Sequence, residues 1–287
     1  MGTVMAVYLP MVHALMKGKE YLLTKKNWKP VTAEQEEFLE YARQAENKLH
    51  MFSDKELAGI ASNSAREVND FLRRRGFDIQ MEQPDRGVVM ASALEVFLKW
   101  LHAGKCVKMI SEGKKYDGAE LNQGFDILYA RGGENFVARI STKKGDKVYM
   151  MPSSPVCQED LVQEIERIRV DMGTGFYPQV YADILRFPMV STDVRPDIDW
   201  LRGLFIDSPK DGIQEITEAK QQVILKLNEQ GMDMKSAVAL GTRGEKKVFE
   251  IDKPFILWAE RRGVAAHPAV WLYAYIDRTD WKDPGRE

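Results

Sequence analysis

Few side chains in this 287-residue sequence have the types and spacing of an enzyme active site. Cys106 and Cys157 lie outside any Cys-x-x-Cys or Cys/His ligand spacing, which argues against a zinc site and against a disulfide scaffold. A Cys/His dyad, such as Cys157 with His267, is a nucleophilic pair that the composition leaves open. The Walker loop, the Gly-x-Ser-x-Gly elbow and the His-Glu-x-x-His motif do not occur. We therefore predict a protein that is not an enzyme and that holds no metal and no cofactor.

The stretch from Ile213 to Trp258 carries the clearest pattern in the chain. Residues Ala219 to Asn228 alternate with the period of two that is typical of a strand. Gly231 interrupts this alternation, which resumes from Met232 to Val238 and fits either a strand or a segment able to become one. Residues 241–247 are polar or charged and include two glycines, so they predict an exposed loop.

The remaining patterns predict an α+β fold. Thr32 with Gln35, and Ser53 with Glu56, have the capping-box spacing that precedes a helix. A further helix is predicted over Glu159 to Val170, with Leu161, Ile165 and Ile168 on its inner face. Three strands with glycines at their turns are predicted before this helix, at Phe125 to Ala130, Asn135 to Ser141 and Asp146 to Met151.

The order of these motifs resembles the serpin family. Members have a strand that ends in Asn-Glu-x-Gly, a hinge, a protease-bait loop and then Phe-x-x-Asp-x-Pro-Phe. The resemblance covers Lys147 to Pro284 well, and it covers Val88 to Gly104 thinly, as the buried helix of the family. The residues that carry the motifs in this chain are Asn228, Glu229, Gly231, Phe249, Asp252, Pro254 and Phe255.

The resemblance implies a serpin-like fold with a helical N-terminal half and mixed or antiparallel sheets in the C-terminal half. Residues 1–75 are predicted to be a helical region without a clear family counterpart. Residues 76–287 are predicted to form a reduced serpin-like domain, as a single compact unit.

The resemblance also assigns roles to the loop. In inhibitory serpins a protease cleaves the bait, and the freed hinge inserts into a sheet as an added strand. The hinge would consist of Glu229, Gly231, Met232, Asp233, Met234, Lys235 and Ser236, and the candidate bait loop contains Arg243, Gly244, Lys246 and Lys247.

The hinge composition favours a protein that binds another protein without trapping proteases. Met232, Met234 and Lys235 stand where inhibitory members prefer small residues, and the loop from Gly231 to Phe249 is shorter than inhibitory loops. The alternative is a working inhibitor of a serine or cysteine protease, with a basic bait residue in 241–247. These basic residues also fit an ordinary solvated loop.

Charge and hydropathy constrain the partners and the compartment. A net charge of −2 and a pI near 6.2 give no global attraction to nucleic acid or to an anionic membrane, so neither is a predicted partner. No run approaches the ~20 apolar residues of a membrane span. The apolar residues Val4 to Met16 lack a preceding Lys or Arg and a following cleavage site, which predicts an intracellular, cytoplasmic protein.

Overall fold

The computed structural model describes residues 2–84, 87–129, 135–156, 158–175, 177–209, 211–230, 247–262 and 268–285. The chain forms two compact units. The first contains Met1–Ala6, Phe97–Val194 and Ile224–Glu287, and the second contains Val7–Val96 and Arg195–Val223. These limits differ from the predicted division between residues 75 and 76, which stays a prediction.

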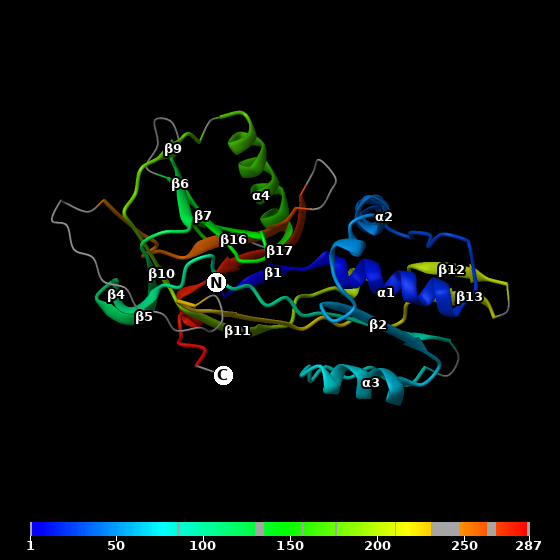
Figure 1. Ribbon diagram of the computed structural model, residues 1–287. Coiled ribbons are helices and arrows are strands. Elements are labelled where there is room, and N and C mark those ends of the chain that lie inside the picture. The colour runs from blue at the N-terminus through cyan, green and yellow to red at the C-terminus, as the bar shows by residue number, and fades with distance from the viewer. Residues whose placement is uncertain are drawn as a thin grey trace. The chain divides into compact units, whose positions relative to one another are not determined.

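A seven-stranded antiparallel sheet forms the centre of the first unit (Figure 1). Both faces of its middle are covered, because every residue of β16 and β17 is buried. Helix α4 (Gln158–Gly173) packs on β1 and β17 through Leu161, Ile165 and Ile168. The strand order is β1 (Val4–Ala6), β17 (Ala269–Ile276), β16 (Phe255–Arg261), β8 (Lys147–Pro152), β7 (Phe136–Ser141), β6 (Phe125–Tyr129) and β9 (Gln179–Val180).

Two buried ion pairs cross this sheet and its helix. Arg261 donates to both carboxylate oxygens of Asp146, at 2.8 and 2.9 Å. Arg169 of α4 donates to Glu260 of β16 at 2.6 Å. A buried carboxylate is tolerated only when it is paired in this way, so these contacts fix the end of β16 against its neighbours.

Two smaller sheets complete the first unit. In the four-stranded sheet only β10 and β15 run parallel, and the other pairs are antiparallel. The order is β15 (Val248–Glu250), β10 (Ile184–Pro188), β5 (Lys114–Leu121) and β4 (Lys105–Ser111). The two-stranded sheet pairs β11 (Val190–Val194) with β14 (Val223–Leu227), and the 3-10 helix η3 (Arg278–Asp280) follows β17.

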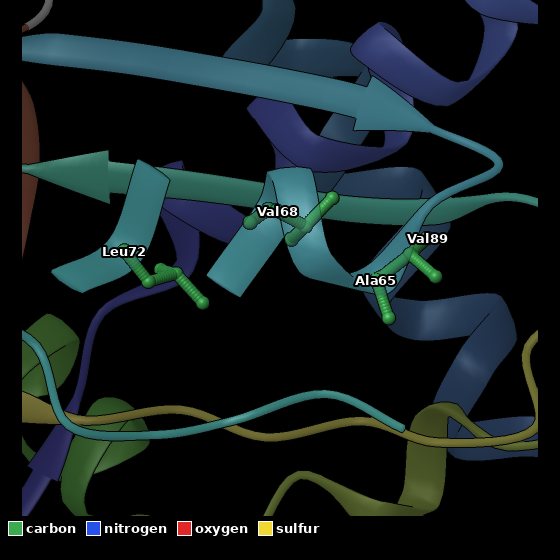
Figure 2. Close-up of a cluster of buried hydrophobic side chains, with 5 residues drawn as sticks. Ala65, Val68, Leu72 and Val89 are labelled. Carbon is green, nitrogen blue, oxygen red and sulfur yellow. The ribbon is translucent and has the colours of Figure 1, made fainter. Parts of the chain in front are cut away.

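The second unit is built on a pair of antiparallel strands with a helix on each face. Strands β2 (Leu57–Ser62) and β3 (Val89–Leu94) pair over six residues each. Helix α1 (Tyr8–Tyr21) packs on one face and α3 (Ala65–Arg74) on the other. Figure 2 shows the α3 side, where Ala65, Val68 and Leu72 belong to one buried cluster with Val89, which lies beside Ala65. The other elements are α2 (Ala33–Glu46), η1 (Leu49–Met51), η2 (Asp199–Leu201), β12 (Phe205–Ser208) and β13 (Gly212–Glu215).

The predicted helix over Val88 to Gly104 is wrong. Residues Val89–Leu94 are strand β3, and none of the residues 88–104 is helical. The physical reason is a period of two: Val89 and Ala91 pack on α3, while Ser92 contacts α1. Both faces of the strand are covered, so apolar residues occur at nearly every position. A buried helix has the same apolar composition.

The two capping boxes have different outcomes. The Thr32 hydroxyl accepts from the Gln35 amide at 3.2 Å and begins α2, as predicted. Ser53 and Glu56 also bond to each other, at 3.1 Å from the Ser53 amide, but the following residues are strand β2 and the predicted helix there is wrong. The predicted α+β class, the three strands β6 to β8 and helix α4 are confirmed.

Candidate functional site

The candidate site consists of the residues on either side of the internal stretch 231–246. The residues just before it are called the first end, and those just after it the second end. The first end follows strand β14, and it is held by a segment from a distant part of the sequence. The Gly104 amide donates to the Glu229 carbonyl at 2.7 Å, and the Trp100 amide donates to the Gln230 carbonyl at 3.4 Å. The Trp100 indole also donates to the Asn228 carbonyl at 2.9 Å. The end of β14 is therefore paired, not open.

Close packing fixes the segment that holds this end. Trp100 is fully buried and meets Phe187 edge to face, with ring centroids 6.1 Å apart. A Cβ on Gly104 would lie 2.5 Å from the Glu120 carbonyl oxygen and 2.6 Å from Leu121 Cδ2. Only glycine fits here without moving the backbone. The sequence thus needs a glycine at 104 so that its amide can reach β14.

The second end runs from Lys247 into β15. Strand β15 pairs in parallel with β10, so that Phe249 lies opposite Leu185. Before the strand begins, Asp183 and Lys247 exchange hydrogen bonds: the Lys247 amide donates to the Asp183 carboxylate at 2.9 Å, and the Asp183 amide donates to the Lys247 carbonyl at 3.0 Å. The Lys247 ammonium lies 5.5 Å from the centre of the Phe249 ring. This end is therefore also held by β-type pairing.

A buried carboxylate links the strands of the sheet that contains the second end. Glu120 of β5 is 2% exposed, and it pairs with Arg186 at 2.8 Å and with Lys105 at 2.9 Å. Burial alone would raise the pKa of Glu120, but the hydrogen bonds and charges of Lys105 and Arg186 outweigh burial and hold that pKa below its usual value. Arg186 also reaches Glu250 of β15 at 3.6 Å. The network thus links β4, β5, β10 and β15.

Most of the predicted hinge and bait residues lie outside the described part of the chain. Glu229 is described and is buried, and Lys247 is described at the start of β15. The residues outside the described ranges are Gly231, Met232, Asp233, Met234, Lys235, Ser236, Arg243, Gly244 and Lys246, together with Cys157 and His267 of the candidate nucleophilic pair. Their assigned roles stay predictions.

The four residues of the predicted core motif have structural contacts. Phe249 packs edge to face on Phe136 at 5.1 Å, and Phe255 is fully buried at the start of β16. The Asp252 carbonyl accepts from the Ser111 hydroxyl at 2.5 Å. The Pro254 carbonyl accepts from the Ser153 amide at 2.9 Å. These contacts fasten the connection between β15 and β16 to neighbouring strands.

Sequence reasoning missed Trp100, Gly104 and Glu120. The first two were included in the predicted helix, so no pairing with β14 was expected. A signal was present in the alternation of Val89, Ala91 and Ala93, which predicts a strand that could run on toward Trp100. No sequence signal connects Glu120 to Arg186, because the two lie on strands far apart in the sequence.

No group of three or more His, Cys, Asp or Glu side chains in the described ranges is arranged to hold a metal ion. Among the helices of the described part, none combines the length and apolar character needed to cross a membrane.

Comparisons with known proteins give the fold. No family model and no curated protein matches the sequence. Thyroxine-binding globulin in complex with thyroxine matches with a TM-score of 0.65 and 11% identity, over 98% of this chain and 94% of that one. The mouse protein Z-dependent protease inhibitor matches with a TM-score of 0.63 and 10% identity, over 96% and 91%.

An insect protein extends the same likeness. Serpin48 of Tenebrio molitor, described as a highly specific serpin, matches with a TM-score of 0.55 and 14% identity, over 96% of this chain and 92% of that one. The likeness spans almost the whole chain and is not limited to Lys147 to Pro284. The chain has the serpin fold, as its motifs predicted.

Proposed function

We propose that this serpin-fold protein acts by binding another protein and does not trap proteases by strand insertion. The observation that carries the proposal is the pairing of Trp100 and Gly104 with Asn228 to Gln230. A strand added beside the end of β14 has to displace the Trp100–Gly104 segment. Each hydrogen bond broken costs about 0.5 to 1.5 kcal/mol unless the inserted strand replaces it.

The composition of the hinge supports the same proposal. Met232, Met234 and Lys235 would have to enter the sheet if the hinge inserted. Forcing a large side chain into packed space costs about 1 to 3 kcal/mol, and burying an unpaired lysine charge costs more. Slow insertion gives a protease time to complete hydrolysis and leave. The expected behaviour is that of a substrate.

Loop length supports it further. The segment between Gln230 and Lys247 begins and ends at paired positions, so only the residues between these ends are free to extend. An extended residue spans at most about 3.3 to 3.6 Å, and each missing residue shortens the reach by that amount. Short reach limits how far a cleaved segment can run along β14.

Trypsin digestion tests the proposal. The full chain is incubated with trypsin, and the products are separated on a denaturing gel while thermal stability is measured before and after cleavage. We expect cleavage at Arg243, Lys246 or Lys247, no protease-sized shift of the band, and no rise in the melting temperature. A covalent complex on the gel would contradict the proposal and support the alternative, a working inhibitor with a basic bait residue.

Two variants sharpen this experiment. Replacing Arg243, Lys246 and Lys247 together by alanine removes the basic residues of the candidate bait loop and should abolish cleavage at 243–247 under the same conditions. Replacing Met232, Met234 and Lys235 together by alanine makes the hinge small. If that variant gains thermal stability after cleavage and the natural sequence does not, hinge size is the cause of the failure to insert.

Affinity capture from the native source tests the binding part of the proposal. The intact chain and the trypsin-cleaved chain serve as parallel baits. We expect one stoichiometric protein partner on the intact chain. Capture of nothing but a protease, held covalently, would overturn the proposal.

A further inference from the structure

Helix α1 ends in an unusual way. The Thr24 amide donates to the Lys19 carbonyl and the Leu23 amide to the Glu20 carbonyl, both at 3.2 Å, which is the Schellman pattern of a helix end. In this pattern the residue before Thr24 takes a left-handed backbone, and glycine normally occupies it. Here it is Leu23, with φ of 51°. A residue with a Cβ is strained in that conformation, by about 1 to 2 kcal/mol.

Packing does not compensate this strain. The Leu23 side chain is 81% exposed, the largest exposure among the large exposed hydrophobic residues of the described ranges. Tyr21, the last residue of α1, is 43% exposed beside it. A leucine that is both strained and exposed contributes little to folding, and strained positions of this kind tend to occur at binding sites. Folding stability therefore does not account for a leucine at this position, whereas a binding role would.

The surrounding segment is strongly basic, although the whole chain is slightly acidic. Residues 17–31 contain five lysines and one glutamate, which gives a net charge of +4 against −2 for the chain. Lys17 pairs with Glu20 at 2.8 Å, and Lys26 pairs with Asp207. Lys19, Lys25 and Lys29 have no carboxylate partner within 4 Å among the described residues.

A second apolar side chain lies near this segment. The Thr24 hydroxyl donates to the Asp207 carbonyl at 3.1 Å, and Asp207 pairs across the strands with Ile213, which is 70% exposed. Figure 1 shows β12 and β13 beside the end of α1. The surface formed by Lys19, Tyr21, Leu23, Lys25, Lys26, Lys29 and Ile213 is called the lysine-leucine surface below.

The chemistry of this surface identifies its occupant. Protein interfaces are depleted in lysine and enriched in arginine, and residues 17–31 contain five lysines and no arginine. Exposed aliphatic and tyrosine side chains between lysines are the pattern of proteins that lie on anionic lipid. We propose that the lysine-leucine surface binds an anionic phospholipid bilayer, with Leu23 entering the interface and the lysines facing the lipid headgroups.

The inference does not rest on the proposed function, and it departs from the prediction of no membrane partner. That prediction rested on the net charge of the whole chain and on the absence of a long apolar run. Binding at a bilayer surface requires neither, because lipid charge acts within a Debye length of about 8 to 10 Å. The relevant quantity is therefore the local charge, which is +4 for residues 17–31 and +3 when Asp207, the partner of Lys26, is included.

Leu23→Gly is a well-matched test variant. Glycine adopts the left-handed backbone without strain, so the substitution should keep or raise the melting temperature while it removes the apolar anchor. The full chain is mixed with vesicles of phosphatidylcholine that contain 30% phosphatidylserine, and bound protein is measured by sedimentation. We expect the natural sequence to bind these vesicles, pure phosphatidylcholine vesicles to bind it at least tenfold more weakly, and Leu23→Gly to reduce binding about tenfold or more.

Charge variants complete the experiment. Each lysine charge removed should weaken binding about fivefold, so Lys25→Glu, which changes the charge by two, should weaken it about twentyfold or more. Matched controls lie on the first unit: Lys114→Glu changes the same charge at the exposed start of β5, and Val170→Ala removes an exposed apolar group. Both controls should bind like the natural sequence.

Three results would overturn the proposal. One is that the natural sequence does not sediment with phosphatidylserine vesicles. Another is that Leu23→Gly and Lys25→Glu bind as well as the natural sequence, and the third is that the two controls lose binding to the same extent. Specific binding of the surface to an acidic protein in place of the vesicles would likewise contradict a lipid occupant.

Discussion

Different interactions stabilise two strand pairs of this protein, namely β16 and β17 of the first unit and β2 and β3 of the second. The first pair occupies the second and third positions from one edge of a seven-stranded sheet, and charge pairs at the end of β16 link it to neighbouring elements. The second pair has no flanking strands in its described sheet, and two helices cover it. Helix α1 approaches it closely at Gly18 and Gly59, whereas α3 packs on it through Ala65, Val68 and Leu72. The stability of the first region therefore depends on paired charges. The close contact of α1 with the second region depends on glycines, which have no side chain.

This difference predicts which substitutions are severe in each region. In the first unit the sensitive groups are those that accept hydrogen bonds from a buried charge. In the second, they are the glycines of α1 and β2 that face a neighbouring side chain.

The largest effect is expected for Asp146→Ala. This substitution leaves the guanidinium of Arg261 buried without its carboxylate, and such a loss costs about 3 to 5 kcal/mol of the free energy of unfolding. Urea denaturation measures it. Glu40→Ala is the control, because Glu40 and Arg43 form an exposed pair on α2 that contributes at most about 1 kcal/mol. Equal losses for the two variants would refute the role assigned to buried charge.

The second effect concerns the contact of α1 with β3. A Cβ on Gly18 would lie 2.1 Å from Met90 Sδ, so Gly18→Ala should lower the free energy of unfolding by about 1 to 3 kcal/mol. The Met90→Ala background removes the clash. We expect a favourable coupling energy of about 0.5 to 3 kcal/mol in the double-mutant cycle. Simple additivity of the two changes would show that the close approach is not what Gly18 provides.

The smallest effect is a pH dependence in the second unit. The hydroxyl of Ser92 donates to the Ala58 carbonyl at 3.1 Å, so His13 Nδ1, 2.9 Å away, donates to Ser92 Oγ. Burial lowers the pKa of His13 below its ordinary value of 6.5, and the Lys17 charge lowers it further, against weaker opposing effects of Glu20 and Asp54.

The sign follows from proton linkage. Below pH 6.5 the unfolded chain protonates His13 before the folded chain does, so the free energy of unfolding falls with the pH until the lower folded pKa is reached. Above pH 6.5 this group contributes no slope. His13→Gln should flatten the stability profile between pH 7 and 5 in urea titrations. An unchanged profile would mean that other groups cause any acid sensitivity of this unit.

The parts of the fold that the sequence predicted are those whose pattern is local. The three apolar segments separated by glycine turns predict β6, β7 and β8, and the spacing of Leu161, Ile165 and Ile168 predicts α4. The α+β class and the likeness to serpins followed from the same local motifs. Such patterns need no knowledge of what each element packs against.

The candidate site was less accessible to sequence reasoning because it joins distant segments. The amide of Gly104 meets the carbonyl of Glu229, and Glu120 meets Arg186. A strand covered on both faces, such as β3, also carries apolar residues at both helical and strand spacing. The composition of Val88 to Gly104 therefore could not decide between a helix and a strand.

The pairing of β15, β16 and β17 determines what happens to the chain after a cut within 231–246. Each of the three strands is hydrogen-bonded to a strand that precedes the cut: β15 to β10, β16 to β8 and β17 to β1. After such a cut the C-terminal fragment therefore remains hydrogen-bonded to the N-terminal fragment along all three strands. A nicked molecule should migrate as a single species on a native gel and separate into two polypeptides only in denaturant.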